Sequence, residues 1–282
     1  MRFVATVFLW LVTTVALAVA VPSMWAQKTI VDENGYSAFA SSAAKERDVQ
    51  QAMADVLGTQ LKKLVEGTGY DVNTDVLRGA AGTYTASTAF PGQFALANSL
   101  VHRWMFTDSV RQADASGRWE IDLSPMLSDS SFRQTLRDFG IEAPSTLEVP
   151  LTENVSNSVR PGQLRQLSTW GPWVSVGATI MTGVFALLTL AVARARGKAL
   201  AALGVSALVV GAAGWAGLEV ARRYINEALN RTTGDIRQVA DAMVNHAEGS
   251  LHQWLNLTLA AGGALVVFGV VVSMLGGLRR RE

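Results

Sequence analysis

The chain has 282 residues, no cysteine and a formal net charge of +1. Without cysteine it can hold no disulfide, no thiolate nucleophile and no cysteine-ligated zinc or iron–sulfur centre. The small net charge gives no indication of nucleic-acid binding. Hydrophobic residues make up 49% of the chain and charged residues 17%, against roughly 25% charged in a typical globular protein.

The apolar excess is concentrated in four blocks. They cover Phe3–Val21, about Trp173–Ala193, Ala199–Val220 and Leu255–Leu275. A helix needs about 20 residues, rising about 1.5 Å each, to cross a hydrocarbon core of about 30 Å. The last three blocks contain almost no charge, as the cost of burying an ion in lipid requires. The sequence therefore predicts a predominantly α membrane protein with four transmembrane helices.

The first block has two interpretations. Its basic start at Arg2 and the small residues Ala18–Ala20 are compatible with a cleavable signal peptide. Its length and the following Pro22, Met24 and Trp25 favour a retained anchor, because tryptophan is typical of a membrane interface. We expect residues 1–25 to remain as an N-terminal transmembrane anchor.

Basic residues set the expected orientation. With four crossings, one side of the membrane receives Arg2, Arg194, Arg196, Lys198 and Arg279–Arg281. The positive-inside rule makes that side cytoplasmic. Both termini are then cytoplasmic, although Arg222 and Arg223 depart locally from the rule.

The same topology divides the chain. Residues 26–170, with 17 acidic and 13 basic residues, are expected to form a small α+β, mostly helical extracytoplasmic domain. Residues 171–282 are expected to form a three-span membrane region, with an extracytoplasmic helical loop at 221–254. The sequence thus predicts a multi-pass protein of the cell membrane.

The extracytoplasmic segment is expected to open with a tether, Gln27–Gly35, and a short helix over Tyr36–Ala44. A helix capped by Asp48 and ended by glycines at 67 and 69 follows. Its apolar positions form one continuous stripe, which predicts an amphipathic helix facing a core. They are Val49, Ala52, Met53, Val56, Leu57, Leu61, Leu64 and Val65.

Two further helices are expected at about Asn73–Ala81 and after Pro91-Gly92, the latter carrying apolar positions to Val110. The period then changes. Trp119, Ile121 and Leu123 alternate with acidic residues, and Leu147, Val149 and Leu151 alternate again, which predicts two half-buried strands. A helix capped by Ser128 or Asp129 and closed by Gly140 lies between them.

Loop 221–254 carries a helical face that leads straight into the fourth span, with a cap at Thr232 or Thr233. We expect it to pack against the larger domain; the alternative is a surface helix lying on lipid. The apolar positions of this face are Ile236, Val239, Ala240, Met243, Ala247, Leu251, Trp254 and Leu255.

The stretch Arg118-Trp119-Glu120-Ile121-Asp122-Leu123-Ser124-Pro125-Met126-Leu127 resembles a segment found in an actinobacterial family of four-span integral membrane proteins of unknown function. Trp25, Val31-Asp32, Tyr36 and Asp48–Ala52 resemble that family's tether and first helix. The family's layout, with a large outside domain after the first span, covers essentially the whole chain. The resemblance implies an actinobacterial inner membrane, with Met126 in place of the family's usual aliphatic residue, and carries no catalytic residues.

No residue pattern in the sequence predicts a catalytic, cofactor-binding or metal site, and no cofactor is expected. His246 and His252 are six residues apart and so do not share a helical face as a metal pair should. His102 lies near Ser99 and Asp108, the residue types of a hydrolase triad, but the chain has no Gly-x-Ser-x-Gly motif. Asp122–Pro125 is interpreted as the end of a strand.

Small residues in the third span (Ala207, Gly211, Gly214) and fourth span (Gly262, Gly269) predict a helix-packing surface. The leading functional prediction is a non-enzymatic protein of the cell envelope that binds or scaffolds through its extracytoplasmic domain. Its expected partners are the bilayer and an unidentified envelope protein or lipid, and not nucleic acid. The alternative is an accessory subunit of an envelope lipid or glycolipid export system, and a third, less favoured, is an envelope hydrolase.

Overall fold

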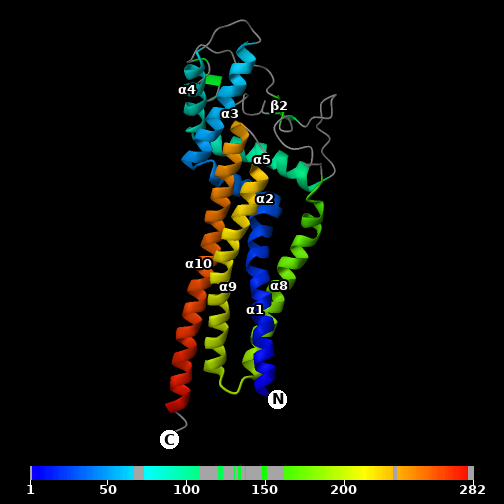
Figure 1. The fold of residues 1–282 in the computed structure, drawn as a ribbon, viewed down its shortest axis with the longest axis vertical. Coiled ribbons are helices and arrows are strands. Elements are labelled where there is room, and N and C mark those ends of the chain that lie inside the picture. The colour runs from blue at the N-terminus through cyan, green and yellow to red at the C-terminus, as the bar shows by residue number, and fades with distance from the viewer. Residues whose placement is uncertain are drawn as a thin grey trace. The chain divides into compact units, whose positions relative to one another are not determined.

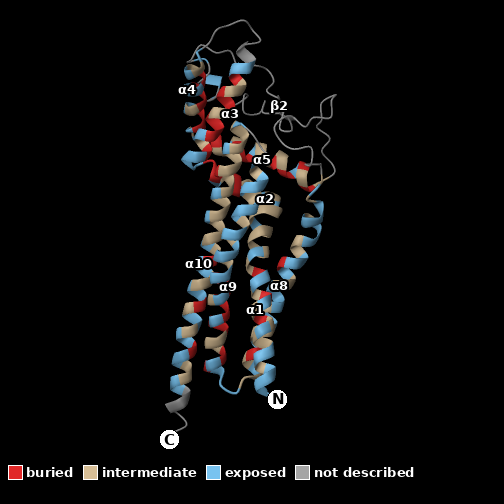
Figure 2. Cartoon of the chain, viewed as in Figure 1, coloured by how far each residue is buried: buried red, intermediate tan, exposed pale blue. Residues whose placement is uncertain are grey.

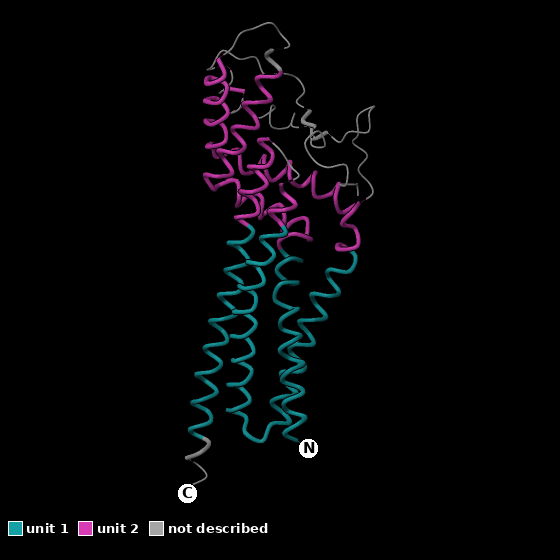
Figure 3. Tube along the Cα trace, in the orientation of Figure 1, with its two compact units in different colours: residues 1–28, 169–224, 247–282 teal, residues 29–168, 225–246 magenta. Residues whose placement is uncertain are grey.

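The computed structural model describes residues 2–66, 73–107, 120–122, 130, 133–134, 137, 148–150, 162–230 and 234–278. Helices dominate these residues, and four have the length and apolar composition needed to cross a membrane (Figure 1). The predicted fold class, predominantly α with four such helices, is confirmed. The chain forms two compact units: unit 1 comprises residues 1–28, 169–224 and 247–282, and unit 2 comprises 29–168 and 225–246 (Figure 3).

The four membrane helices are α1 (Arg2–Ala26), α8 (Arg165–Val192), α9 (Arg196–Leu229) and α10 (Asp235–Leu278). Each extends beyond the apolar block predicted from the sequence. An apolar block includes only the residues that can lie in the hydrocarbon core of the membrane. The helix itself is longer, because its backbone hydrogen bonds continue into the more polar residues on either side. Pro22 accordingly lies inside α1 rather than ending it.

The predicted tether is wrong, because the chain stays helical through it. A π-helical turn, η1 (Gln27–Val31), follows α1 directly, and α2 (Glu33–Ala43) begins after Asp32. The Asp32 carboxylate caps α2 by accepting a hydrogen bond from the Gly35 amide at 2.8 Å. The capped helix therefore begins three residues before the expected start at Tyr36. The polar composition of residues 27–35 had led to the prediction of a tether there.

Helix α3 (Arg47–Glu66) carries the predicted apolar stripe. Its stripe positions Val49, Ala52, Met53, Val56, Leu57 and Leu61 are all buried, while Leu64 and Val65 lie outside the described side chains. The prediction that Asp48 caps this helix is wrong, because Asp48 belongs to the first turn. There its negative charge is favourable beside the positive end of the helix dipole.

Helices α4 (Thr74–Thr85) and α5 (Phe90–Phe106) correspond to the two further predicted helices. The Asn73 side chain caps α4 by accepting a hydrogen bond from the Asp75 amide at 2.9 Å. Helix α5 begins before Pro91 rather than after it, because a proline in the first helical turn lacks only an amide that would have no partner there. Val110 falls outside the described residues.

The core of unit 2 lies among these helices, where α3 packs beside α4 and α2 beside α5. Figure 2 shows the buried residues gathered on the inward faces of α3 and α4. Phe90 bridges two aromatic neighbours, with ring centroids 5.8 Å from Tyr84 and 5.5 Å from Phe94. These spacings suit edge-to-face and tilted aromatic pairs, which add to the free energy gained by burying the rings.

Strands β1 (Glu120–Asp122) and β2 (Glu148–Pro150) pair antiparallel, with Ile121 opposite Val149. They coincide with the centres of the two predicted strands. One three-residue pair gives no support for describing the segment as an α+β domain. The predicted cap at Ser128 or Asp129, the closing Gly140 and the ends of both strands fall outside the described residues.

Helix α10 is one continuous helix that includes both the predicted loop face and the fourth span. Gly234 precedes it with φ of +74°, a conformation that favours glycine, while Thr232 and Thr233 lie outside the described residues. Ala242 belongs to the buried core of unit 2, and Val239 and Met243 pack against that core. The expected packing of this helix against the larger domain is thus confirmed.

Candidate functional site

A recess of about 290 Å³ opens in unit 2 between α3 and α10. Its floor includes two buried small residues, Ala52 and Ala242, and its rim carries carboxylates and carboxamides. The helical spacing of the lining residues places each set on one face of its helix. The lining residues are Asp48, Gln51 and Ala52 of α3 with Gln238, Asp241, Ala242 and Asn245 of α10.

The recess is lined mainly by acidic and carboxamide side chains. Asp48 and Asp241 supply negative charge, and the carboxamides supply both donors and acceptors. Arg237 lies 3.4 Å from Asp241 and offsets part of that charge. Its volume is at the lower limit of small-molecule pockets, which run from about 300 to 1,000 Å³, and suits a single protruding side chain.

His246 lies near this recess in sequence but makes contacts of its own. Its Nδ1 is 3.8 Å from the Glu46 carboxylate, and its ring centroid is 5.1 Å from that of Phe39. His252 instead stacks on Trp215 in unit 1, with ring centroids 3.8 Å apart. The two histidines therefore serve separate packing contacts on the same helix.

His102 lies in a second polar cluster, between α2 and α5. Its Nε2 is 3.0 Å from the Ile30 carbonyl oxygen, and its ring stacks on Phe106 with centroids 4.3 Å apart. The Tyr36 hydroxyl donates to the Asn98 side-chain oxygen at 3.3 Å. Burial raises the pKa of the Tyr36 hydroxyl above its ordinary value, so this group stays neutral at physiological pH.

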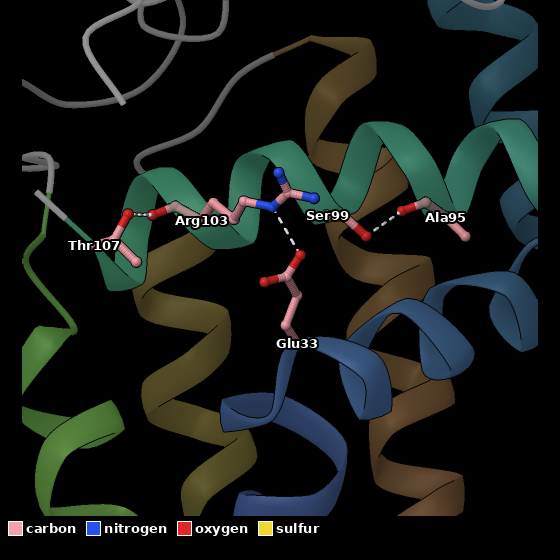
Figure 4. A network of polar contacts seen from close by, with 5 residues as sticks. All are labelled: Glu33, Ala95, Ser99, Arg103 and Thr107. Atoms are coloured by element: carbon pink, nitrogen blue, oxygen red, sulfur yellow. Dashed lines mark hydrogen bonds and ion pairs between the residues drawn. The ribbon is translucent and has the colours of Figure 1, made fainter. Parts of the chain in front are cut away.

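The surface side of the same helix pair carries an ion pair. The Arg103 guanidinium donates to the Glu33 carboxylate at 2.7 Å, joining α5 to the first turn of α2 (Figure 4). Both side chains are about half exposed, so the pair adds little to stability.

The three residue types of a triad do not assemble in the described part of the chain. The Ser99 hydroxyl donates to the Ala95 carbonyl oxygen at 2.9 Å, one turn back in its own helix (Figure 4). His102 is engaged with Ile30, and Asp108 lies outside the described residues. Of the segment Asp122–Pro125, only Asp122 is described, at the end of β1.

In unit 1, α9 and α10 pack through the glycines that the sequence analysis singled out and two that it missed. A Cβ atom on Gly197 would lie 2.5 Å from the Ser273 amide nitrogen, and one on Gly204 would lie 2.6 Å from the Gly262 carbonyl oxygen. Real Cβ atoms do not approach backbone so closely. The predicted packing surface is confirmed, and it joins the third and fourth spans.

Polar bonds join α1 to α9 within unit 1. The Trp10 indole donates to the Ala202 carbonyl oxygen at 2.8 Å, and the hydroxyls of Thr14 and Ser206 are 2.8 Å apart. Ser206 is almost completely buried. In hydrocarbon such groups need a protein partner, so these bonds fix the register of the first span against the third.

The two ends of unit 1 differ in composition. Because α1 and α9 run in one direction and α8 and α10 in the other (Figure 1), one end receives the exposed aromatic residues Trp170, Trp173, Trp215 and Tyr224. The other end receives Arg2, Arg194, Arg196 and Lys198. Arg222, at the aromatic end, lies 3.6 Å from the Glu248 carboxylate, which balances its charge.

An apolar groove of about 630 Å³ runs between α1 and α8. In Figure 3 the two helices diverge toward the N-terminal end of α8. The groove is lined by Phe8, Leu11, Val12, Val15, Ala16 and Val19 of α1 and by Trp173, Val174, Gly177, Ala178 and Met181 of α8.

No protein-family model, curated protein or solved structure matches the chain. The resemblance to an actinobacterial membrane-protein family therefore stays a prediction.

Neither the recess nor the groove could be predicted from the sequence, for one reason. Each is made by two helices far apart in the chain, and the period of one helix does not identify its neighbour. A signal for the recess was present, because polar Asp48 and Gln51 flank the apolar stripe of α3. Gln238 and Asn245 flank the corresponding stripe of α10. Only the pairing of the two helices turns these edges into one site.

Proposed function

We propose that this protein is a non-enzymatic integral membrane protein of the cell envelope that binds a partner protein through unit 2. The observation that carries the proposal is the recess between α3 and α10. Its size suits one side chain, and its two carboxylates, of which Asp241 is partly balanced by Arg237, favour a basic one. The partner is then a protein that inserts a lysine or arginine between Asp48 and Asp241.

The proposal includes an orientation, with both termini cytoplasmic and residues 26–170 and 221–254 extracytoplasmic. The basic residues at one end of unit 1, Arg2, Arg194, Arg196 and Lys198, support it through the positive-inside rule. The resemblance to the actinobacterial family supports the assignment to a cell envelope. The two alternating stretches at residues 119–123 and 147–151 support an α+β character for residues 26–170.

A double substitution tests the partner site. The full-length protein, extracted in mild detergent, is used to capture partners that are then identified by mass spectrometry. A partner recovered with the native chain should be lost with Asp48→Asn/Asp241→Asn, and its recovery should fall as salt is raised. The control Asp75→Asn/Glu227→Gln removes two exposed carboxylates elsewhere in unit 2 and should keep the partner.

The result that overturns the proposal is equal recovery of every partner with the two double variants. In that case the carboxylates of the recess take no part in binding. A photo-cross-linking residue in place of the exposed Gln51 provides a second measurement. It should link covalently to the same partner, and a cross-link to lipid alone would also contradict the proposal.

A second candidate function is an accessory role in the export of an envelope lipid or glycolipid. The observation that favours it is the apolar groove between α1 and α8. It ranks second because a groove that holds lipid need not move it.

A further inference from the structure

The groove between α1 and α8 lies between two membrane spans and is open on the side that faces away from the protein. In the most apolar 18-residue stretch of each of these two spans, only 11% of the residues are buried inside the protein. Large apolar side chains on both walls are exposed, among them Phe8, Val15 and Trp173. In a bilayer the medium that meets these side chains is hydrocarbon, so the occupant must be apolar along its whole buried length.

The length of the groove limits the occupant further. Its lining on α1 runs from Phe8 to Val19. At a rise of about 1.5 Å per residue, this run is about 16 Å long, or about half of a 30 Å hydrocarbon core. That is the depth of one leaflet. A membrane-spanning helix would need the full thickness, whereas one acyl chain of a bilayer lipid needs only half.

The ends of the groove fix the direction of the chain within it. Trp173 lies at one end, 75% exposed, on the side of unit 1 that also carries the other exposed aromatic residues. Tryptophan at this level favours the boundary between headgroups and acyl chains. Phe8 and Met181 line the other end; Met181 lies near the middle of its apolar block, and Phe8 lies in the N-terminal half of its own.

We propose that this groove is a binding site for one acyl chain of a membrane phospholipid, with the headgroup at the Trp173 end. Gly177 lies on the α8 wall with free space beside it, because a Cβ atom added there would meet nothing within 4 Å. A larger side chain at this position is therefore expected to extend into the groove. This proposal is independent of the partner site in unit 2.

Gly177→Leu tests the site, and Gly183→Leu is the matched control. Gly183 lies on the same helix, also has free space around its Cβ position, and does not line the groove. Native mass spectrometry of the full-length protein in detergent should show a retained phospholipid in the native chain and in Gly183→Leu. Its occupancy should fall at least five-fold in Gly177→Leu.

Two outcomes would overturn the site: equal phospholipid occupancy in both variants, or a native dimer that Gly177→Leu alone dissociates, because a second copy would then fill the groove. A phosphatidylcholine carrying a diazirine in its acyl chain supplies a test that needs no variant. In reconstituted native protein it should label peptides within 8–19 and 173–181 above all others. Uniform labelling of all four spans would mean that the groove holds only bulk lipid.

Discussion

Gly204 of α9 and Gly262 of α10 meet backbone against backbone, so that a Cβ atom on Gly204 would lie 2.6 Å from the Gly262 carbonyl oxygen. The contact repeats one heptad away, where Gly197 faces Gly269. Glycine at both places lets the third and fourth spans approach more closely than any other residue would allow.

Replacing Gly204 with leucine should therefore force α9 and α10 apart. Overpacking of this kind costs about 1–3 kcal/mol or more. We expect a lower midpoint of thermal unfolding in detergent, followed by size-exclusion chromatography after heating. Gly217→Leu, on the same helix where nothing lies within 4 Å, is the control and should unfold near the native midpoint. Equal midpoints for the two variants would contradict the close contact.

The fourth span and its glycines illustrate how far the sequence leads. Apolar length alone identifies a span, because hydrocarbon admits few other sequences. The pairing of Gly204 with Gly262 was not predictable, since small residues mark a contact surface without naming the helix that meets it. In unit 2 the six stripe positions of α3 whose side chains are described were all predicted, but the recess that the stripe borders depends on the neighbouring α10. The prediction of a tether around Asp32 was wrong, because the Asp32 side chain caps a helix, α2, that begins at the next residue.

The first span should remain on the mature protein. Trp10 and Thr14 bond to Ala202 and the buried Ser206 of α9, and cleavage near Val21 would remove both bonds. The Ser206 hydroxyl would keep only its longer bond, 3.3 Å, to the Ala202 carbonyl oxygen. Intact-mass measurement of the membrane-extracted protein should give a species that includes the first span, near 30.1 kDa. A product that begins near Val21 would show that the block is a signal peptide.

The proposed orientation predicts opposite labelling at two exposed positions of this cysteine-free chain. A cysteine in place of Thr88, in unit 2, should react with a membrane-impermeant thiol reagent in intact spheroplasts. One in place of Ala195, between α8 and α9, should react only after the membrane is permeabilised. Labelling of the Ala195 variant alone in intact cells would invert the topology.

Burial of Tyr36 predicts a loss of stability at alkaline pH. Its folded-state pKa is raised above 10.0, so unfolding makes the hydroxyl easier to ionise. The resulting stabilisation is fully present below about pH 10 and is lost as the pH rises through the folded-state value. Pulse proteolysis between pH 9 and pH 12, in Tyr36→Phe and the native chain, should show a smaller alkaline loss in the variant. Parallel losses would assign the effect to other groups.

The last prediction concerns the part of α10 that belongs to unit 2. Val239 and Met243 are partly buried and pack against the core that contains Ala242, so each contributes less than the about 1.5–3 kcal/mol of a fully buried apolar side chain. Val239→Asp/Met243→Asp places two charges against this core, where desolvation disfavours them. We expect faster proteolysis within residues 29–168, while unit 1 stays inserted in the membrane.

The control for this variant is Asn226→Asp/Ala228→Asp, which adds two carboxylates at exposed positions of α9 in the same unit. It should leave the proteolysis rate within residues 29–168 near that of the native chain, because exposed charges stay hydrated. A peptide of residues 221–254 supplies the opposing measurement, since a helix that lies on lipid would bind vesicles. If Val239→Asp/Met243→Asp weakens that vesicle binding and leaves the proteolysis unchanged, this part of α10 belongs to the membrane surface instead of the core.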